Sequence, residues 1–169
     1  MKVGRMIISI LLMISAIFAL YVWKSAKTVS TAAPWLVGQP CPAWKVSDLS
    51  GTRLIGDFAT GRPLVVILGS QKCDACARLL TALTMLLDDI NKKADILVLE
   101  WPIGDQPSTG TELLLQAGLQ AYEVTDTSQI HGFILPTILV IDSQNTVAFD
   151  LRGWHPNIWQ IVSSVLDTA

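Results

Sequence analysis

The chain has 169 residues, of which 51% are hydrophobic and 15% charged, and its formal net charge is −2. This composition excludes an intrinsically disordered chain, because disordered chains are poor in apolar residues and rich in charge. It also argues against nucleic-acid binding, since there is no excess of basic side chains to neutralise phosphates. The three cysteines are too few for a small domain held together by disulfides.

The N-terminal segment predicts a membrane anchor. Residues 6–23 carry no charge, and as a helix they would span about 27 Å, close to the ~30 Å hydrocarbon core of a bilayer. Their length favours a retained transmembrane signal anchor over a cleaved signal peptide, although the small residues at 30–33 would suit a cleavage site. Because Lys2 and Arg5 precede the span, we expect residues 1–5 in the cytoplasm and the bulk of the chain outside it.

The remainder predicts a linker and one folded domain. Residues 24–35 are mostly small and polar, as in a tether, and residues 36–169 are enough for a single core. A continuous apolar run at 64–68 predicts a strand buried on both faces. Apolar residues at steps of three and four predict an amphipathic helix over 74–93, and residues 96–99 predict a second buried strand.

Two further helices are expected in the second half of the chain. Residues 111–120 predict a short helix that Gly118 weakens. Asn157 is placed to cap a last helix over 158–166.

A strand pair is expected between those helices. Residues 137–141 and 146–149 are apolar and flank the turn-rich tetrapeptide 142–145. The succession of strands and helices predicts an α/β fold, with a central mixed sheet flanked by helices and preceded by the N-terminal transmembrane helix.

The motif that points to chemistry is Cys73-Asp74-Ala75-Cys76, where a buried strand gives way to a helix. Cys73 would lie at the helix N-terminus, which stabilises a thiolate, and Cys76 would be shielded under the first turn. Lys72 favours that thiolate and Asp74 opposes it. Two alternatives stay open, namely half of a zinc site and two unreactive structural cysteines.

Leu135-Pro136-Thr137 stands directly before a predicted strand. Proline cannot donate to a sheet, so Pro136 belongs at the first position of a strand or in a turn. Because only about 5–6% of X–Pro bonds are cis, the residues alone favour a trans peptide here.

Several motifs resemble one family in order and spacing. They are Gly-Gln-Pro-Cys-Pro-Ala-Trp at 38–44, Asp-Leu-Ser-Gly at 48–51, the Cys-x-x-Cys after a strand, and Leu-Pro-Thr-Ile-Leu-Val-Ile-Asp at 135–142. Together with the predicted anchor they resemble the membrane-tethered thioredoxin-like proteins of the TlpA/ResA type. The resemblance implies a thioredoxin fold, with Cys73 as attacking and Cys76 as resolving thiol. It also implies a cis Pro136 and a substrate peptide that pairs with the backbone at Leu135, which makes Leu135, Pro136 and Thr137 the candidate substrate-binding residues.

The chain departs from that family at two places. Residues 69–72 contain no aromatic side chain before the first cysteine, and the strand 64–68 contains no acidic one. Glu100, at the end of the next predicted strand, could replace that acid or could simply be solvated. We assign the tryptophans to packing, with Trp154 as a candidate for the border of the active face.

Cys41 lies between two prolines, which excludes an ordinary helix or central strand. It is open whether Cys41 is an incidental small residue, a free thiol, an intermolecular partner, or a third redox centre that reaches Cys73.

The sequence therefore predicts a protein-disulfide reductase that needs no cofactor. It would be a single-pass protein of a bacterial inner membrane, with its catalytic domain in the periplasm or outside the cell. A membrane protein would supply electrons, and clients would be apocytochrome c or other extracytoplasmic thiol proteins. Two alternatives are a thiol peroxidase, suggested by the spacing of Ser70 and Cys73, and a tethered module in which Cys41, Cys73 and Cys76 hold copper or zinc.

Overall fold

The computed structural model describes residues 35–169 except 49, 71–72, 102–113, 115–117 and 131. These described residues belong to one compact unit. None of the helices in this described part is long and apolar enough to cross a membrane. The predicted anchor at 6–23 lies outside the described residues, as do Lys72 and most of the predicted helix at 111–120.

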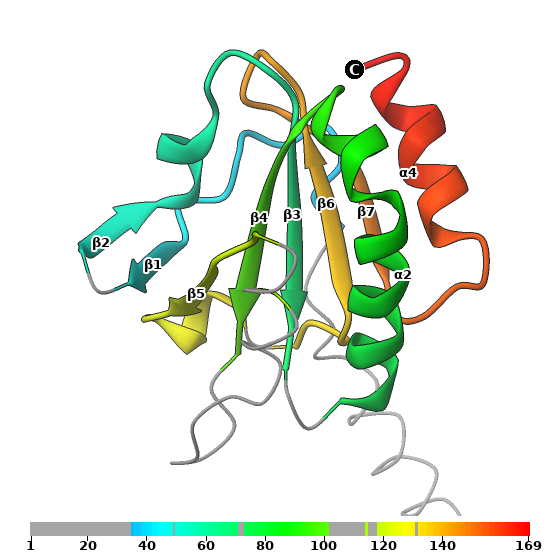
Figure 1. Ribbon diagram of the computed structural model, residues 1–169. Coiled ribbons are helices and arrows are strands. Elements are labelled where there is room, and N and C mark those ends of the chain that lie inside the picture. Colours follow the sequence, from blue (N-terminus) through cyan, green and yellow to red (C-terminus); the bar gives the residue numbers. More distant parts are fainter. Residues whose placement is uncertain (1–34, 49, 71–72, 102–113, 115–117, 131) are drawn as a thin grey trace, which may run out of the picture. The chain divides into compact units, whose positions relative to one another are not determined.

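The described residues form a seven-stranded mixed sheet with the spatial order β2-β1-β5-β4-β3-β6-β7 (Figure 1). The central strand β3 is parallel to β4 and antiparallel to β6, so the predicted mixed sheet is confirmed. The strands are β1 (Lys45–Asp48), β2 (Gly51–Leu54), β3 (Leu64–Gly69), β4 (Asp95–Glu100), β5 (Ala121–Val124), β6 (Thr137–Ile141) and β7 (Val147–Arg152).

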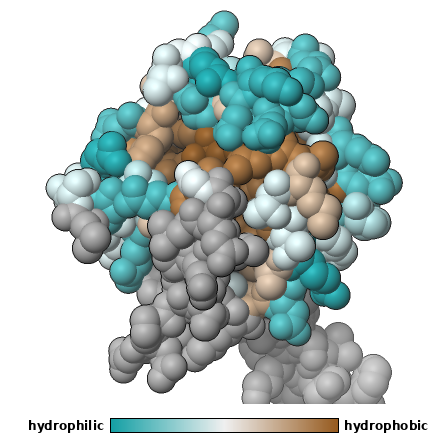
Figure 2. All heavy atoms as spheres, in the orientation of Figure 1, coloured by the Kyte–Doolittle hydropathy of each residue, from teal (hydrophilic) through white to brown (hydrophobic). Residues whose placement is uncertain are grey.

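Two helices, α2 (Asp74–Asn91) and α4 (Ile158–Leu166), lie together on one face of the sheet (Figure 1). The opposite face is covered by side chains from loops and from two short 3₁₀ turns, η1 (Ile55–Phe58) and η2 (Thr127–Ile130). In the orientation of Figure 2, hydrophobic atoms reach the surface in the middle of the view and hydrophilic atoms line much of its rim.

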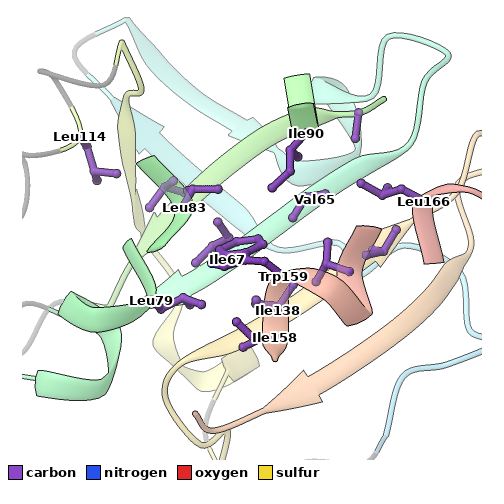
Figure 3. Packing of buried hydrophobic residues seen from close by; sticks show 14 residues of the cluster. Val65, Ile67, Leu79, Leu83, Ile90, Leu114, Ile138, Ile158, Trp159 and Leu166 are labelled. Atoms are coloured by element: carbon purple, nitrogen blue, oxygen red, sulfur yellow. The ribbon is translucent and has the colours of Figure 1, made fainter. Parts of the chain in front are cut away.

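The strand β3 is buried on both faces, as its continuous apolar run predicts. Val65 and Ile67 pack against α2 and α4 (Figure 3). Leu64, Val66 and Leu68 point the other way, into the second cluster of buried residues. Each such side chain contributes about 1.5–3 kcal/mol when fully buried, so two layers of packing fix the strand from which the cysteine motif emerges.

The strand β6 and the helix α4 have the predicted bounds, and α2 ends two residues before the predicted position 93. The strand β7 begins one residue after the predicted 146 and extends three residues beyond the predicted 149. One detail is corrected. Asn157 occupies the N-cap position of α4, but its side chain makes no capping hydrogen bond. Its backbone N–H instead donates to Nδ1 of His155 at 3.2 Å.

Candidate active site

The two cysteines of the motif lie at the start of α2, shortly after the end of β3. Cys73 is the N-cap residue of α2, and its backbone is extended (φ −114°, ψ 103°). Its carbonyl accepts the N–H groups of Cys76 and Ala77 at 2.9 and 3.1 Å, which starts the helix. Cys76 follows one turn later, with 5.2 Å between the two Cα atoms, and the two side chains form a disulfide.

The two sulfurs of this pair differ in exposure and surroundings. Cys76 is 2% exposed, whereas Cys73 is only half-buried. The backbone N–H of Cys76 donates to the sulfur of Cys73 at 3.1 Å. Helix N-terminal N–H groups stabilise a thiolate, so the reduced pair would carry its reactive sulfur on Cys73. This is the asymmetry that the motif predicts.

Asp74 is the acidic residue of the first turn of α2 and is exposed. A carboxylate next to Cys73 opposes a thiolate there, although solvent screens exposed charges at this end of the helix. The N-terminal N–H groups and Asp74 therefore act in opposite directions on the same sulfur.

The peptide bond between Leu135 and Pro136 is cis. The expectation of a trans bond from base rates is wrong at this position, and the expectation from the family resemblance is confirmed. Thr137 begins β6 and pairs with Leu68 of β3. Because the two strands are antiparallel, Pro136, one residue before Thr137, lies opposite Gly69, the last residue of β3. Pro136 itself is buried and Leu135 is half-buried.

The disulfide lies beside this proline. A Cβ atom added to Gly69 would meet the sulfur of Cys76 at 3.7 Å, so Cys76 packs directly over the end of β3. Neighbouring strands are about 4.8 Å apart. The disulfide and the Leu135–Pro136 peptide, which are about 60 residues apart in the sequence, therefore meet at one end of the sheet through the β3–β6 pairing.

Two exposed apolar side chains that the sequence did not mark as a pair frame this end of the sheet. Ile134 precedes Leu135 and is 56% exposed, and Trp154 is 39% exposed. The guanidinium carbon of Arg78, on α2, lies 5.8 Å from the centre of the Trp154 ring. This contact agrees with the expectation that Trp154 borders the active face. The only sequence feature that could have indicated Ile134 is its place in the apolar run before Pro136.

Thr137 does not face solvent. It is fully buried, and its hydroxyl donates to the carbonyl of Ile134 at 2.6 Å. Its side chain therefore stabilises the turn before Pro136 and does not line the surface.

Cys41 lies at the opposite end of the sheet. Its N–H donates to the carbonyl of Asn145 at 2.8 Å, in the turn between β6 and β7. That turn follows Ile141, which pairs with Leu64 at the start of β3. Cys73 follows the far end of β3, and the six residues between span roughly 20 Å at ~3.3 Å per residue.

The separation of Cys41 from Cys73 along the length of β3 excludes two of the alternatives left open by the sequence. Cys41 cannot serve as a third redox centre that reaches Cys73, and the three sulfurs cannot share one metal ion. Within the described residues, no group of three or more His, Cys, Asp or Glu side chains could hold a metal. The Cys41 thiol donates to the carbonyl of Pro42 at 3.7 Å, and burial raises its pKa from 9.0 to about 11.

These features define a thioredoxin-like α/β fold, in which a Cys-x-x-Cys starts the helix after a central strand and a cis-proline starts the neighbouring one. No protein-family model matches the chain, and no curated protein matches it either.

Solved structures share the fold. The thioredoxin domain of a thiol-disulfide oxidoreductase from Bacteroides vulgatus superposes with a TM-score of 0.60 at 14% identity, covering 79% of this chain and 99% of that one. A thiol:disulfide interchange protein from Bacteroides sp. gives 0.58 at 15% identity, covering 79% and 91%. A variant of the peroxiredoxin 6 of Arenicola marina gives 0.58 at 10% identity, covering 80% and 73%. At these identities the likeness shows the fold.

Proposed function

We propose that this protein is an extracytoplasmic thiol–disulfide oxidoreductase that reduces protein disulfides. The observation that carries the proposal is the Cys73–Cys76 disulfide, with one shielded and one accessible sulfur, at a helix N-terminus beside the Leu135–Pro136 peptide. In the reduced protein, the backbone N–H that reaches the Cys73 sulfur would stabilise a thiolate on that cysteine.

The reaction proceeds in two thiol–disulfide exchanges. The Cys73 thiolate of the reduced protein attacks a client disulfide; a mixed disulfide forms and the first client sulfur leaves as a thiolate. The Cys76 thiolate then attacks the sulfur of Cys73, which releases the second client thiolate and forms the Cys73–Cys76 disulfide. Two electrons pass from the dithiol to the client, and the two released client thiolates take up protons.

Client binding would use the turn before Pro136. The family resemblance implies that an extended client segment pairs with the backbone at Leu135, next to the sulfur of Cys73. The exposed side chain of Ile134 and the Trp154 ring then offer apolar contact on either side of the client disulfide. The hydrogen bond from Thr137 to the Ile134 carbonyl supports the shape of this turn.

Two sequence features support the proposed direction and the proposed place of the reaction. Asp74 opposes a strongly stabilised thiolate, and a less stabilised thiolate makes a weaker oxidant, which favours the reductase direction. The uncharged segment 6–23 would anchor the protein in a bacterial inner membrane, with a membrane protein as electron donor. Apocytochrome c and other extracytoplasmic thiol proteins are the proposed clients.

The test compares Cys73→Ser with Cys41→Ser in an insulin reduction assay, followed by turbidity. We expect Cys73→Ser to lose the activity and Cys41→Ser to keep it, because Cys41 lies at the other end of the sheet. Full activity in Cys73→Ser would remove Cys73 from the mechanism. The reduction potential of the Cys73–Cys76 couple then decides the direction of electron flow.

A thiol peroxidase is the second candidate. Ser70 is 7% exposed and its carbonyl accepts the N–H of Cys73 at 3.2 Å, so the backbone of this hydroxyl-bearing residue lies next to the cysteine. A peroxide-consumption assay separates the two functions. Rapid peroxide consumption combined with no insulin reduction would replace the reductase proposal.

A further inference from the structure

A buried arginine lies directly behind the turn that precedes Pro136. Arg152 ends β7 and pairs with Thr137 in the sheet. The next residue, Gly153, donates its N–H to the carbonyl of Pro136 at 2.7 Å. Arg152 is therefore fixed by the backbone next to the segment 133–136, at the same end of the sheet as the disulfide.

The guanidinium of Arg152 contacts two aromatic rings. Its central carbon lies 4.5 Å from the ring centre of Phe133, which begins that segment, and 4.6 Å from the ring centre of Trp35. Phe133 in turn meets the edge of Trp44, with 5.3 Å between ring centres. Phe133 is thus held between a cation and a buried ring.

The charge of Arg152 is compensated inside the protein. Its side chain is 5% exposed, and that of Asp150 is 0% exposed. Two hydrogen bonds join them, from Nε to Oδ1 at 3.1 Å and from Nη2 to Oδ2 at 2.7 Å. Oδ2 also accepts the N–H of Leu36 at 3.0 Å. A planar, two-point pairing of this kind suits arginine and not lysine.

The ion pair therefore connects three distant parts of the chain: the first described residues at 35–36, the strand β7, and the segment 133–136 that leads into Pro136. Desolvating two charges is costly, and a buried ion pair is weak evidence for added stability. The arrangement is better explained by position than by stability, since Arg152 contacts Phe133 in the segment that leads into Pro136, while Gly153 beside it donates to the Pro136 carbonyl.

We propose that Arg152 is a positioning residue for client binding. This inference rests on the proposed function. Through its contact with Phe133, Arg152 holds the segment 133–136 in the conformation that pairs with an extended client. Trp35 also packs against the Arg152 guanidinium. Arg152 does not touch the reacting sulfurs, so it should affect disulfides that need the segment and leave small ones unaffected.

The experiment measures the reduced protein against two disulfides, insulin and the small aromatic disulfide 5,5′-dithiobis(2-nitrobenzoic acid). For Arg152→Met we expect KM for insulin to rise about tenfold, the effect of losing about 1.4 kcal/mol of ring contact, with kcat within about twofold. The rate with the small disulfide should not change. Arg152→Lys keeps the charge but not the planar contacts, so its KM should stay close to that of Arg152→Met.

The chain supplies a matched control. Arg53, on β2, also contacts two rings, with its guanidinium carbon 4.2 Å from the ring centre of Phe58 and 5.6 Å from that of Tyr122. Strands β2 and β7 are the two opposite edges of the sheet. Arg53→Met should therefore leave both reactions unchanged.

A second variant covers the case in which Arg152→Met does not fold. Trp35 is 65% exposed, so Trp35→Leu should fold, and we expect it to raise KM for insulin about threefold. An unchanged KM in the folded variants, or an equal loss with both disulfides, would overturn the inference. Absence of insulin reduction in the wild-type protein would instead overturn the proposed function, so the two failures are distinct.

Discussion

Cys73 and Cys41 lie at opposite ends of the same sheet, and the comparison shows how surroundings decide the chemistry of a thiol. Cys73 begins a helix, receives the N–H of Cys76 at its sulfur, and pairs with a neighbouring cysteine. Cys41 sits between two prolines, is half-buried, and donates to a carbonyl. One environment stabilises negative charge on sulfur, and the other raises the pKa of the thiol to about 11.

The two ends also differ in what surrounds the sulfur. Near Cys73 the structure places Ile134 and Trp154 at the surface. Cys41 instead joins the apolar cluster on one face of the sheet, close to Gly56 and Asn145. The first sulfur therefore has exposed apolar side chains at its end of the sheet, whereas the second packs against a buried cluster.

The largest expected effect comes from Cys76→Ser. Without the resolving sulfur, the mixed disulfide between Cys73 and a client cannot be released from within the protein, so turnover should stop and the adduct should accumulate. Non-reducing gels and mass spectrometry detect the adduct. Cys41→Ser is the control and should form none beyond the wild-type level. Sustained turnover by Cys76→Ser would contradict the role of Cys76 as the resolving thiol, because a sulfur other than Cys76 would then have to resolve the adduct.

The next prediction concerns the packing of α2, the helix that carries the cysteine motif, against the sheet. Leu79 is fully buried between α2 and the sheet, so Leu79→Ala should cost about 2–5 kcal/mol of unfolding free energy. Met85, on the same helix but 79% exposed, should cost less than about 0.5 kcal/mol when changed to alanine. Urea unfolding of the oxidised protein measures both. Equal costs would mean that α2 is not held through the packing seen here.

A smaller change is expected in the rate at which the Cys41 thiol is alkylated. A pKa raised from 9.0 to about 11 lowers the thiolate population at pH 7 about 100-fold, so iodoacetamide should label Cys41 slowly in the folded, oxidised protein. The rate should rise with pH up to about 11 and should increase on unfolding at neutral pH. Mass spectrometry over a pH series follows it. Labelling at pH 7 as fast as in the unfolded chain would contradict the protected environment of Cys41.

Much of the layout of the active end was predictable. The apolar run of β3 and the spacing of apolar residues in α2 are local patterns, and both place Cys73 at a strand-to-helix boundary. The strands β1, β2 and β5 gave no such signal. They have four residues each, and β2 is exposed along its whole length, so neither a buried run nor a clear alternation marks them.

Local sequence patterns thus predicted the strand β3, the helix α2 and which of the two sulfurs is the shielded one. These features depend on residues within a turn or two of each other. The position of Cys41 at the opposite end of the sheet from Cys73 depends instead on tertiary contacts, and so does the cis Leu135–Pro136 bond, where the local preference is only about 0.5–1 kcal/mol. The tertiary structure also joined Asp150 to the N–H of Leu36 across 114 residues of sequence. Such contacts depend on which strands become neighbours in the sheet, and that choice is made by the packing of the whole core.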